Sequence, residues 1–104
     1  MKPSLSRVKL YFNWILGLIE SDPRILSFKI IRERFSLEKG FIQISAQLLK
    51  NLRLEIFEYY SISKGLIDYR YQLMHPNNQI IARWDIAPHH PEISTHPYHL
   101  HYQN

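Results

Sequence analysis

Apolar residues near the start of the chain recur three or four positions apart, at the spacing of one helical face. The recurring residues are Leu5, Val8, Phe12, Ile15, Leu16 and Ile19. Ser4 can cap the first turn of such a helix, because its hydroxyl can accept a hydrogen bond from a free backbone amide. Pro23 disfavours helical backbone at Asp22. The pattern therefore predicts an amphipathic helix from about Ser4 to about Ile19.

From Ile25 the period of the pattern changes to two, which is typical of half-buried β-strands. Two alternating apolar sets, over 26–30 and 31–37, differ in phase by one residue at Ile30-Ile31. Such a change of phase moves the apolar side chains to the other face of a sheet, so it predicts a β-bulge or a strand break. We expect a turn at Lys39-Gly40 after the second set.

The clearest half-buried strand covers 42–48, where apolar residues alternate with glutamine and serine. Lys50-Asn51 predicts the turn that ends it. The β-branched and aromatic residues over 52–60 favour a further strand, and 61–65 has the composition of another turn.

Two later segments, 66–74 and 79–85, predict the arms of a hairpin across Pro76-Asn77-Asn78. Asparagine tolerates the positive φ that a tight hairpin turn requires. A two-residue turn at Asn77-Asn78 sets a definite register, in which each side chain has a cross-strand partner on its own face. The expected pairs are Leu73 with Ala82 and Tyr71 with Trp84 on one face, and Gln72 with Arg83 and Arg70 with Asp85 on the other.

These elements predict an α+β fold, with an N-terminal helix packed on an antiparallel β-meander of about five strands and a His/Pro-rich C-terminal loop. At 104 residues the chain is long enough for one modest core, so we expect residues 1–104 to form a single domain without internal repeats.

Composition narrows the function classes only modestly. The formal net charge of +4 and the pI near 9.5 favour a polyanionic or acidic partner. The absence of cysteine excludes disulfides, thiol nucleophiles and thiolate metal sites. No run approaches the roughly 20 apolar residues of a membrane span, and the apolar stretch 10–19 is interrupted by Asn13 and lacks a small-residue cleavage site. We therefore expect a cytoplasmic protein.

Histidine is concentrated near the end of the chain, where five of the six histidines lie between His89 and His101. Pro88, Pro91 and Pro97 punctuate this segment, so it predicts a rigid, extended loop instead of a helix. Imidazole changes charge near neutral pH, which suits proton transfer, metal ligation or phosphate contact. The alternative is that these histidines only fix an irregular loop by hydrogen bonds to backbone carbonyls.

A metal site is the weaker of two chemical interpretations. His99 and His101 would share one face of a strand and could share a metal, but the adjacent His89 and His90 would diverge. The nearby carboxylates are Asp85 and Glu92, and no compact ligand motif is present. No metal or other cofactor is therefore predicted.

Metal-free cleavage of RNA is the other interpretation. It needs a base for the 2′-hydroxyl, an acid for the leaving oxygen and a cation for the developing phosphorane charge. Histidines can fill the first two roles and Arg70 or Arg83 the third, with Tyr69 or Tyr71 as a donor or stacking platform. Two simpler explanations stay open. Arg70 and Asp85 would form only a cross-strand ion pair, and Tyr69, Tyr71 and Trp84 would only pack the sheet.

Three segments together resemble a known family. They are 65–73 with a YRYH-like strand, 80–91 with an RRWDNAPHHP-like turn, and 95–101 with a TFPHHxH-like tail. Their order and content resemble the TumE-like toxin family, which was first described as a domain of unknown function. The resemblance is strong over roughly the last 40 residues and extends upstream only as a general layout of helix and strands.

The resemblance implies a prokaryotic toxin of a type II toxin–antitoxin pair that inhibits growth, with a helix-turn-helix antitoxin as partner and RNA as the target. A homodimer is left open. The pattern transfers to Tyr69, Arg70, Tyr71, Arg83, Trp84, Asp85, Pro88, His89, His90, His99 and His101. The expected roles are acid/base catalysis by the four histidines, phosphate binding by the two arginines, orientation of an imidazole or an arginine by Asp85, and substrate binding by Tyr69, Tyr71 and Trp84.

This chain departs from the family pattern at two positions, where Gln72 replaces a histidine and Ile86 replaces an asparagine. It also ends at Asn104, where relatives usually continue. Two alternatives to an RNA-cleaving toxin follow. One is a toxin that blocks an RNA or protein target without catalysis, and the other is a degenerate, inactive copy.

Overall fold

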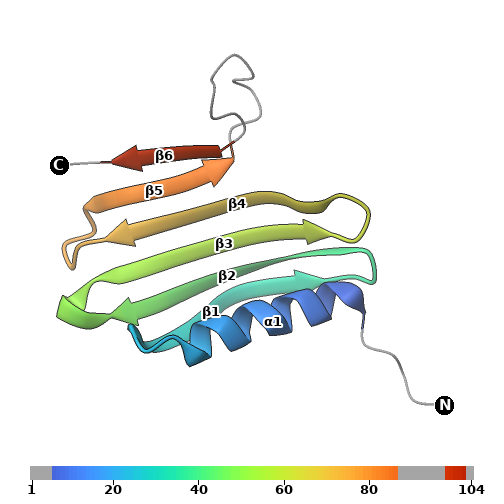
Figure 1. The fold of residues 1–104 in the computed structure, drawn as a ribbon, viewed down its shortest axis with the longest axis horizontal. Helices are drawn as coiled ribbons and strands as arrows, with labels where there is room; N and C mark the ends of the chain where they lie inside the picture. Colours follow the sequence, from blue (N-terminus) through green and yellow to red (C-terminus); the bar gives the residue numbers. More distant parts are fainter. Residues whose placement is uncertain (1–5, 87–97, 103–104) are drawn as a thin grey trace.

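The structure, a computed structural model, describes residues 6–86 in full and the backbone of residues 98–102. One helix precedes a six-stranded sheet in which every strand is antiparallel to its neighbours in sequence order (Figure 1). The elements are α1 (Arg7–Ser21), β1 (Ile25–Phe35), β2 (Lys39–Leu48), a 3₁₀ turn (Leu49–Asn51), β3 (Arg53–Ser61), β4 (Gly65–Met74), β5 (Ile80–Ile86) and β6 (Tyr98–Tyr102). The predicted fold class is confirmed, as a helix on an antiparallel meander.

The helix begins two residues later than the sequence pattern suggested. Ser6, with extended backbone, caps α1, and its hydroxyl accepts a hydrogen bond from the Lys9 amide at 3.1 Å. The prediction of Ser4 as the cap is therefore wrong. Ser6 and Ser4 offer the same chemistry, and only the position at which the chain meets the sheet distinguishes them.

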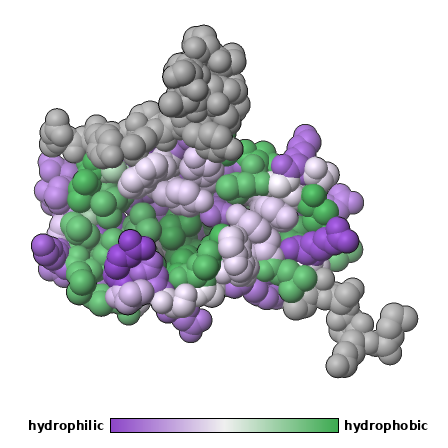
Figure 2. Space-filling view, in the orientation of Figure 1, coloured by the Kyte–Doolittle hydropathy of each residue, from purple (hydrophilic) through white to green (hydrophobic). Residues whose placement is uncertain are grey.

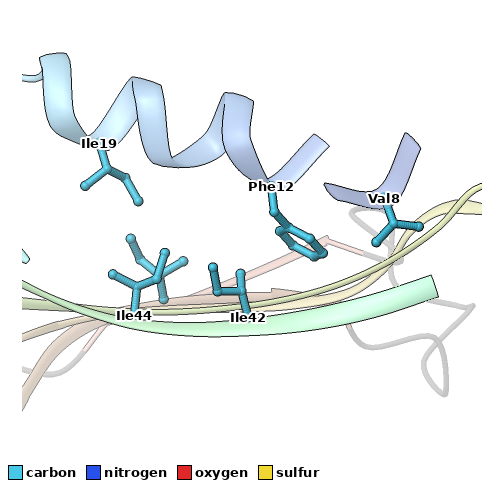
Figure 3. Packing of buried hydrophobic residues seen from close by; sticks show 6 residues of the cluster. Val8, Phe12, Ile19, Ile42 and Ile44 are labelled. Atoms are coloured by element: carbon cyan, nitrogen blue, oxygen red, sulfur yellow. The ribbon is translucent and has the colours of Figure 1, made fainter. Parts of the chain in front are cut away.

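The core lies between α1 and the first strands of the sheet. Val8, Phe12 and Ile19 point from the helix towards Ile42 and Ile44 of β2 (Figure 3). The alternation of β2 produces this surface, because every second residue from Gly40 to Ala46 is buried. The ring of Phe12 also stacks on Phe35 at 5.0 Å between centroids.

The phase change at Ile30-Ile31 is a register irregularity, as predicted. The pairing of β1 with β2 shifts between Ile30 and Arg32. The predicted turn at Lys39-Gly40 is wrong, because both residues belong to β2.

The turn between β1 and β2 lies just before Lys39-Gly40. The Ser36 hydroxyl accepts hydrogen bonds there from the amides of Glu38 and Lys39. Gly40 is needed for close packing: a Cβ at this position would lie 2.6 Å from the Phe35 ring and 2.7 Å from the Arg34 carbonyl oxygen. The glycine therefore indicates a tight contact within the hairpin and not its turn.

The hairpin of β4 and β5 has the predicted register. All four predicted pairs occur, namely Leu73 with Ala82, Tyr71 with Trp84, Gln72 with Arg83 and Arg70 with Asp85. The turn differs from the expected two-residue form. The Asn78 amide donates to the His75 carbonyl at 3.0 Å, Asn78 has φ 71°, and a bulge interrupts the pairing of the arms between Leu73 and Met74. These features make a three-residue turn that preserves the register of the arms.

The two faces of the sheet are covered unequally. Figure 1 is seen from the side that carries α1, which lies over β1 and β2. On this side hydrophobic residues spread beyond the helix over the later strands (Figure 2). None of the elements that the structure describes covers the opposite side, which we call the open face.

The C-terminal segment holds a strand where a loop was expected. Residues 98–102 form β6, which pairs with β5. The prediction of a loop is therefore wrong for these residues. Local composition suggested a loop, whereas pairing with the free edge of β5 gives the backbone groups of this segment hydrogen-bond partners.

Candidate functional site

Four polar residues of β4 and β5 whose pairing was predicted from the sequence lie at open-face positions. Arg70 is paired with Asp85, and Gln72 with Arg83. Because successive side chains of a strand point to opposite faces, Tyr71 and the neighbouring odd-numbered residues of β4 point to the other side. The arginines and Asp85 of the predicted site are therefore brought together on one surface.

The register of β6 adds two histidine positions to this surface. His99 is paired with Asp85, and His101 with Arg83. When the cross-strand pairs are followed from β1 to β6, the paired residues form two rows that cross the whole sheet. One row contains Arg32, Gln43, Phe57, Arg70, Asp85 and His99, and the other contains Lys29, Ser45, Glu55, Gln72, Arg83 and His101. Neighbouring strands lie about 4.8 Å apart, so the backbones of Arg70 and His99 are separated by roughly 10 Å.

Asp85 is held by Arg83 of its own strand. The Arg83 Nε lies 3.0 Å and one terminal guanidinium nitrogen 2.9 Å from Asp85 Oδ2. The Asp85 side chain is 13% exposed and that of Arg83 37%. The ion pair that Asp85 makes within residues 6–86 is therefore with Arg83, although its register partner is Arg70.

Arg70 is exposed, and its guanidinium makes no ion pair with another residue of 6–86. It lines a groove of about 420 Å³ on the open face, together with Gln43, Ser45, Glu55, Phe57 and Gln72. Glu55, which also lines this groove, is held by Arg53 at 2.5 Å and by the Ser45 hydroxyl at 3.0 Å. Arg70 is thus a cation at the wall of a polar groove, available to an anionic ligand.

Tyr69, Tyr71 and Trp84 do not share the face of Arg70 and Arg83. The two tyrosine rings stack on each other at 4.9 Å, and the Tyr71 hydroxyl donates to Glu58 at 2.6 Å. Trp84 lines a concavity with Leu54 and Leu73 on the side of α1. The contacts described for these three residues are made within the protein, so a substrate-binding role for them stays a prediction. His89 and His90 lie outside the described residues.

A buried carboxylate on the helix side was missed by the sequence analysis. Glu58 of β3 is 3% exposed and accepts hydrogen bonds from the hydroxyls of Tyr11 and Tyr71. It shares the alternation phase of Leu54, Ile56 and Tyr60, which was the available signal. A buried carboxylate requires hydrogen-bond donors, so the hydroxyls of the two tyrosines are needed by Glu58 in addition to the packing of their rings.

Burial, and then the hydrogen bond to Glu58, raise the pKa of both tyrosines above the ordinary value of 10.0. The folded protein therefore holds these phenol protons more tightly than the unfolded chain. Their contribution to stability is complete below roughly pH 10 and is lost as the pH rises above it. We expect the free energy of unfolding to fall above this pH, measured by urea denaturation across the alkaline range.

The Tyr71→Phe variant should show a shallower alkaline decline than the wild type, from a lower starting stability. Tyr59→Phe, on the open face, is the matched control and should keep the wild-type slope. An equal slope in all three proteins would show that Tyr71 does not contribute to the decline.

The open face also carries aromatic and basic residues that the sequence analysis did not connect. Phe41, Phe57 and Tyr59 lie there, because their positions share the phase of Gln43 and Ser45. Basic residues at open-face positions are Lys29, Arg32, Arg34, Lys39, Arg53, Arg70 and Arg83, against Glu55, Asp68 and Asp85. A sheet face with arginines and accessible rings is suited to single-stranded nucleic acid.

In the described part of the chain, no three histidine or carboxylate side chains gather as metal ligands. The prediction that no metal is used stays a prediction, since the side chains of most histidines lie outside this part. Among the described helices, none is long and apolar enough to cross a membrane.

Comparison with known proteins gives one match. The model of the family described as Toxin TumE matches residues 15–104. No curated protein and no solved structure matches the chain. The matched range begins within α1 and includes every strand of the sheet.

Proposed function

The chain belongs to the toxin TumE family, and from this premise we propose that it is the toxin of a type II toxin–antitoxin pair that inhibits growth by cleaving RNA. The observation that carries the proposal is the row of Arg70, Asp85 and His99, which runs beside that of Gln72, Arg83 and His101 on a basic sheet face that none of the described elements covers. Both rows have the residue types that cleavage of a phosphodiester without metal requires.

The chemistry divides among these residues as follows. One histidine of His89, His90, His99 and His101 removes the proton of the 2′-hydroxyl, whose oxygen attacks the adjacent phosphorus. A second histidine protonates the leaving 5′-oxygen, so that the products are a 2′,3′-cyclic phosphate and a 5′-hydroxyl end. Arg70 and Arg83 stabilise the charge that develops on the phosphorane oxygens, and Asp85 orients Arg83 or an imidazole.

A toxin of this family implies an antitoxin partner, which we expect to be a helix-turn-helix protein, and both would act in the cytoplasm. Co-expression of the protein encoded next to the toxin should neutralise it and should allow the two to be purified together.

Two alternatives are supported by particular residues. The aromatic and basic open face would also serve a toxin that blocks its RNA target without cleaving it. Gln72 lies in the groove, in the row of Arg83 and His101, where the family pattern has a histidine. This position keeps open a degenerate copy that has lost activity.

Induced expression in a bacterial host tests the proposal. We expect growth arrest together with new RNA fragments ending in 2′,3′-cyclic phosphate, and we expect a His89→Ala/His90→Ala double variant to lose both. Growth and total RNA would be followed in the same cultures, with equal amounts of folded protein as the control.

The other outcomes separate the alternatives. Arrest without fragments would reject cleavage in favour of a blocking toxin. If the wild type is harmless and Gln72→His restores arrest and cleavage, the chain is a degenerate copy whose defect lies at position 72.

A further inference from the structure

A second concavity on the open face lies at the β1–β2 hairpin, away from the proposed catalytic rows. It has a volume of about 410 Å³, and its side walls include Arg34, Lys39, Phe41 and Tyr59. Phe41 and Tyr59 are paired across β2 and β3, and both are half-buried. We call these four residues the hairpin pocket. We propose that it binds an unpaired nucleobase of the RNA target, a specificity site that rests on the proposed action on RNA.

The aromatic walls of the hairpin pocket continue towards the catalytic rows. Phe57 lies 6.1 Å from Phe41, measured between ring centroids, and the planes are inclined by 31°. Phe57 is in turn paired with Arg70, and both line the groove of the open face. Rings and cations therefore follow one another from the hairpin pocket to the row that contains Arg70, Asp85 and His99.

Positive charge surrounds these rings. The Arg32 guanidinium lies 5.5 Å from the centre of the Phe41 ring and is held there by a hydrogen bond to Gln43 at 2.7 Å. Arg34 and Lys39 stand in the pocket wall itself. Accessible rings flanked by cations match a ligand in which flat, aromatic groups alternate with anionic groups, and single-stranded RNA is such a ligand. This complementarity favours a nucleobase over an apolar peptide segment.

The distance between the hairpin pocket and the histidine positions of β6 sets how long the unpaired part of the RNA must be. Phe41 on β2 and His99 on β6 are four strand spacings apart, which corresponds to roughly 20 Å. An RNA that fills both places must be unpaired over several nucleotides, because rings can stack on bases only where these are splayed out. The base in the hairpin pocket would then fix which phosphate reaches the catalytic rows.

Binding of a labelled, single-stranded 2′-O-methyl oligoadenylate tests the inference, because this probe lacks the nucleophile for cleavage. Phe41→Ala and Tyr59→Ala should each lower the affinity roughly tenfold, from the loss of one stacking contact. Phe41→Tyr and Tyr59→Phe should retain it. Trp14→Ala, which removes an aromatic side chain that is 59% exposed on α1, is the matched control and should bind like the wild type.

Two further comparisons separate the loss of base stacking from a disturbed fold and from contacts to the RNA backbone. Phe41→Leu keeps apolar volume in the pocket and removes only the ring, so it should lose affinity while remaining folded. An oligonucleotide with abasic positions should bind the wild type more weakly and should be insensitive to Phe41→Ala. Equal effects of Phe41→Ala on both oligonucleotides would overturn the assignment of a base to the pocket.

The same measurements distinguish a pocket that binds no base from a protein that does not act on RNA. If Arg70→Ala weakens binding but the hairpin-pocket variants do not differ from Trp14→Ala, the pocket does not bind a base and the RNA target stands. If the wild type binds no single-stranded RNA, both proposals fall together.

Discussion

The Arg70→Ala variant is expected to cleave RNA about a hundredfold more slowly than the wild type, or slower still. Loss of one preorganised group that stabilises an oxyanion typically lowers the rate by roughly 10²–10³. Arg70 is exposed at the wall of the groove and has no ion-pair partner among residues 6–86, so its charge is available to a phosphate. The measurement is the single-turnover rate on a short labelled RNA with purified protein.

Arg70 gives a cleaner test than Arg83. Removal of Arg83 would break its ion pair with the mostly buried Asp85, and a loss of activity could then reflect a change in structure. Arg70→Ala should leave the free energy of unfolding within about 0.5 kcal/mol of the wild type, as is usual for exposed positions.

Two companion variants complete the test of Arg70. Arg70→Lys should be intermediate, since it keeps the charge and loses the planar fork of donors. Arg24→Ala, at an exposed arginine of the α1–β1 connection, is the control and should cleave at the wild-type rate. A folded Arg70→Ala variant with an unchanged rate would remove Arg70 from the mechanism.

The Phe12→Ala variant is expected to lose about 3–5 kcal/mol of stability, the range for truncation of a buried phenylalanine. Phe12 is fully buried in the core cluster and contacts the rings of Tyr11, Phe35 and Tyr60. Small domains are stable by only about 5–15 kcal/mol, so much of the protein could unfold at ordinary temperature. Urea denaturation would measure the loss.

The control for Phe12→Ala is Leu10→Ala, on the exposed side of the same helix. It should change the free energy of unfolding by far less, because no cavity forms at an exposed position. Equal losses in the two variants would mean that α1 is not held to the sheet by its buried side.

Local patterns of the sequence were sufficient to predict several features of the fold. The predicted register of β4 and β5, and hence the pairing of Arg70 with Asp85, is correct although the turn has three residues instead of two, because the bulge between Leu73 and Met74 compensates for the additional residue. The phase step at Ile30-Ile31 was sufficient for the bulge in β1. Such patterns repeat within a few residues, and a slip by one residue would exchange the two faces, so the register is strongly specified.

Long-range packing, which local patterns do not encode, sets which face of the sheet α1 covers and which strands join to form the open face. Alternation separates Arg70 from Tyr71, but the position of α1 decides that Tyr71 meets buried Glu58 while Arg70 stays accessible. The pairing of β6 with β5, which brings His99 opposite Asp85, joins segments whose contact no local pattern encodes. The gathering of Phe41, Tyr59 and Arg34 at one end of the open face likewise depends on strands meeting across hairpins. These long-range contacts are fixed by burial and backbone pairing of the whole domain, and for that reason periodicity alone could not predict them.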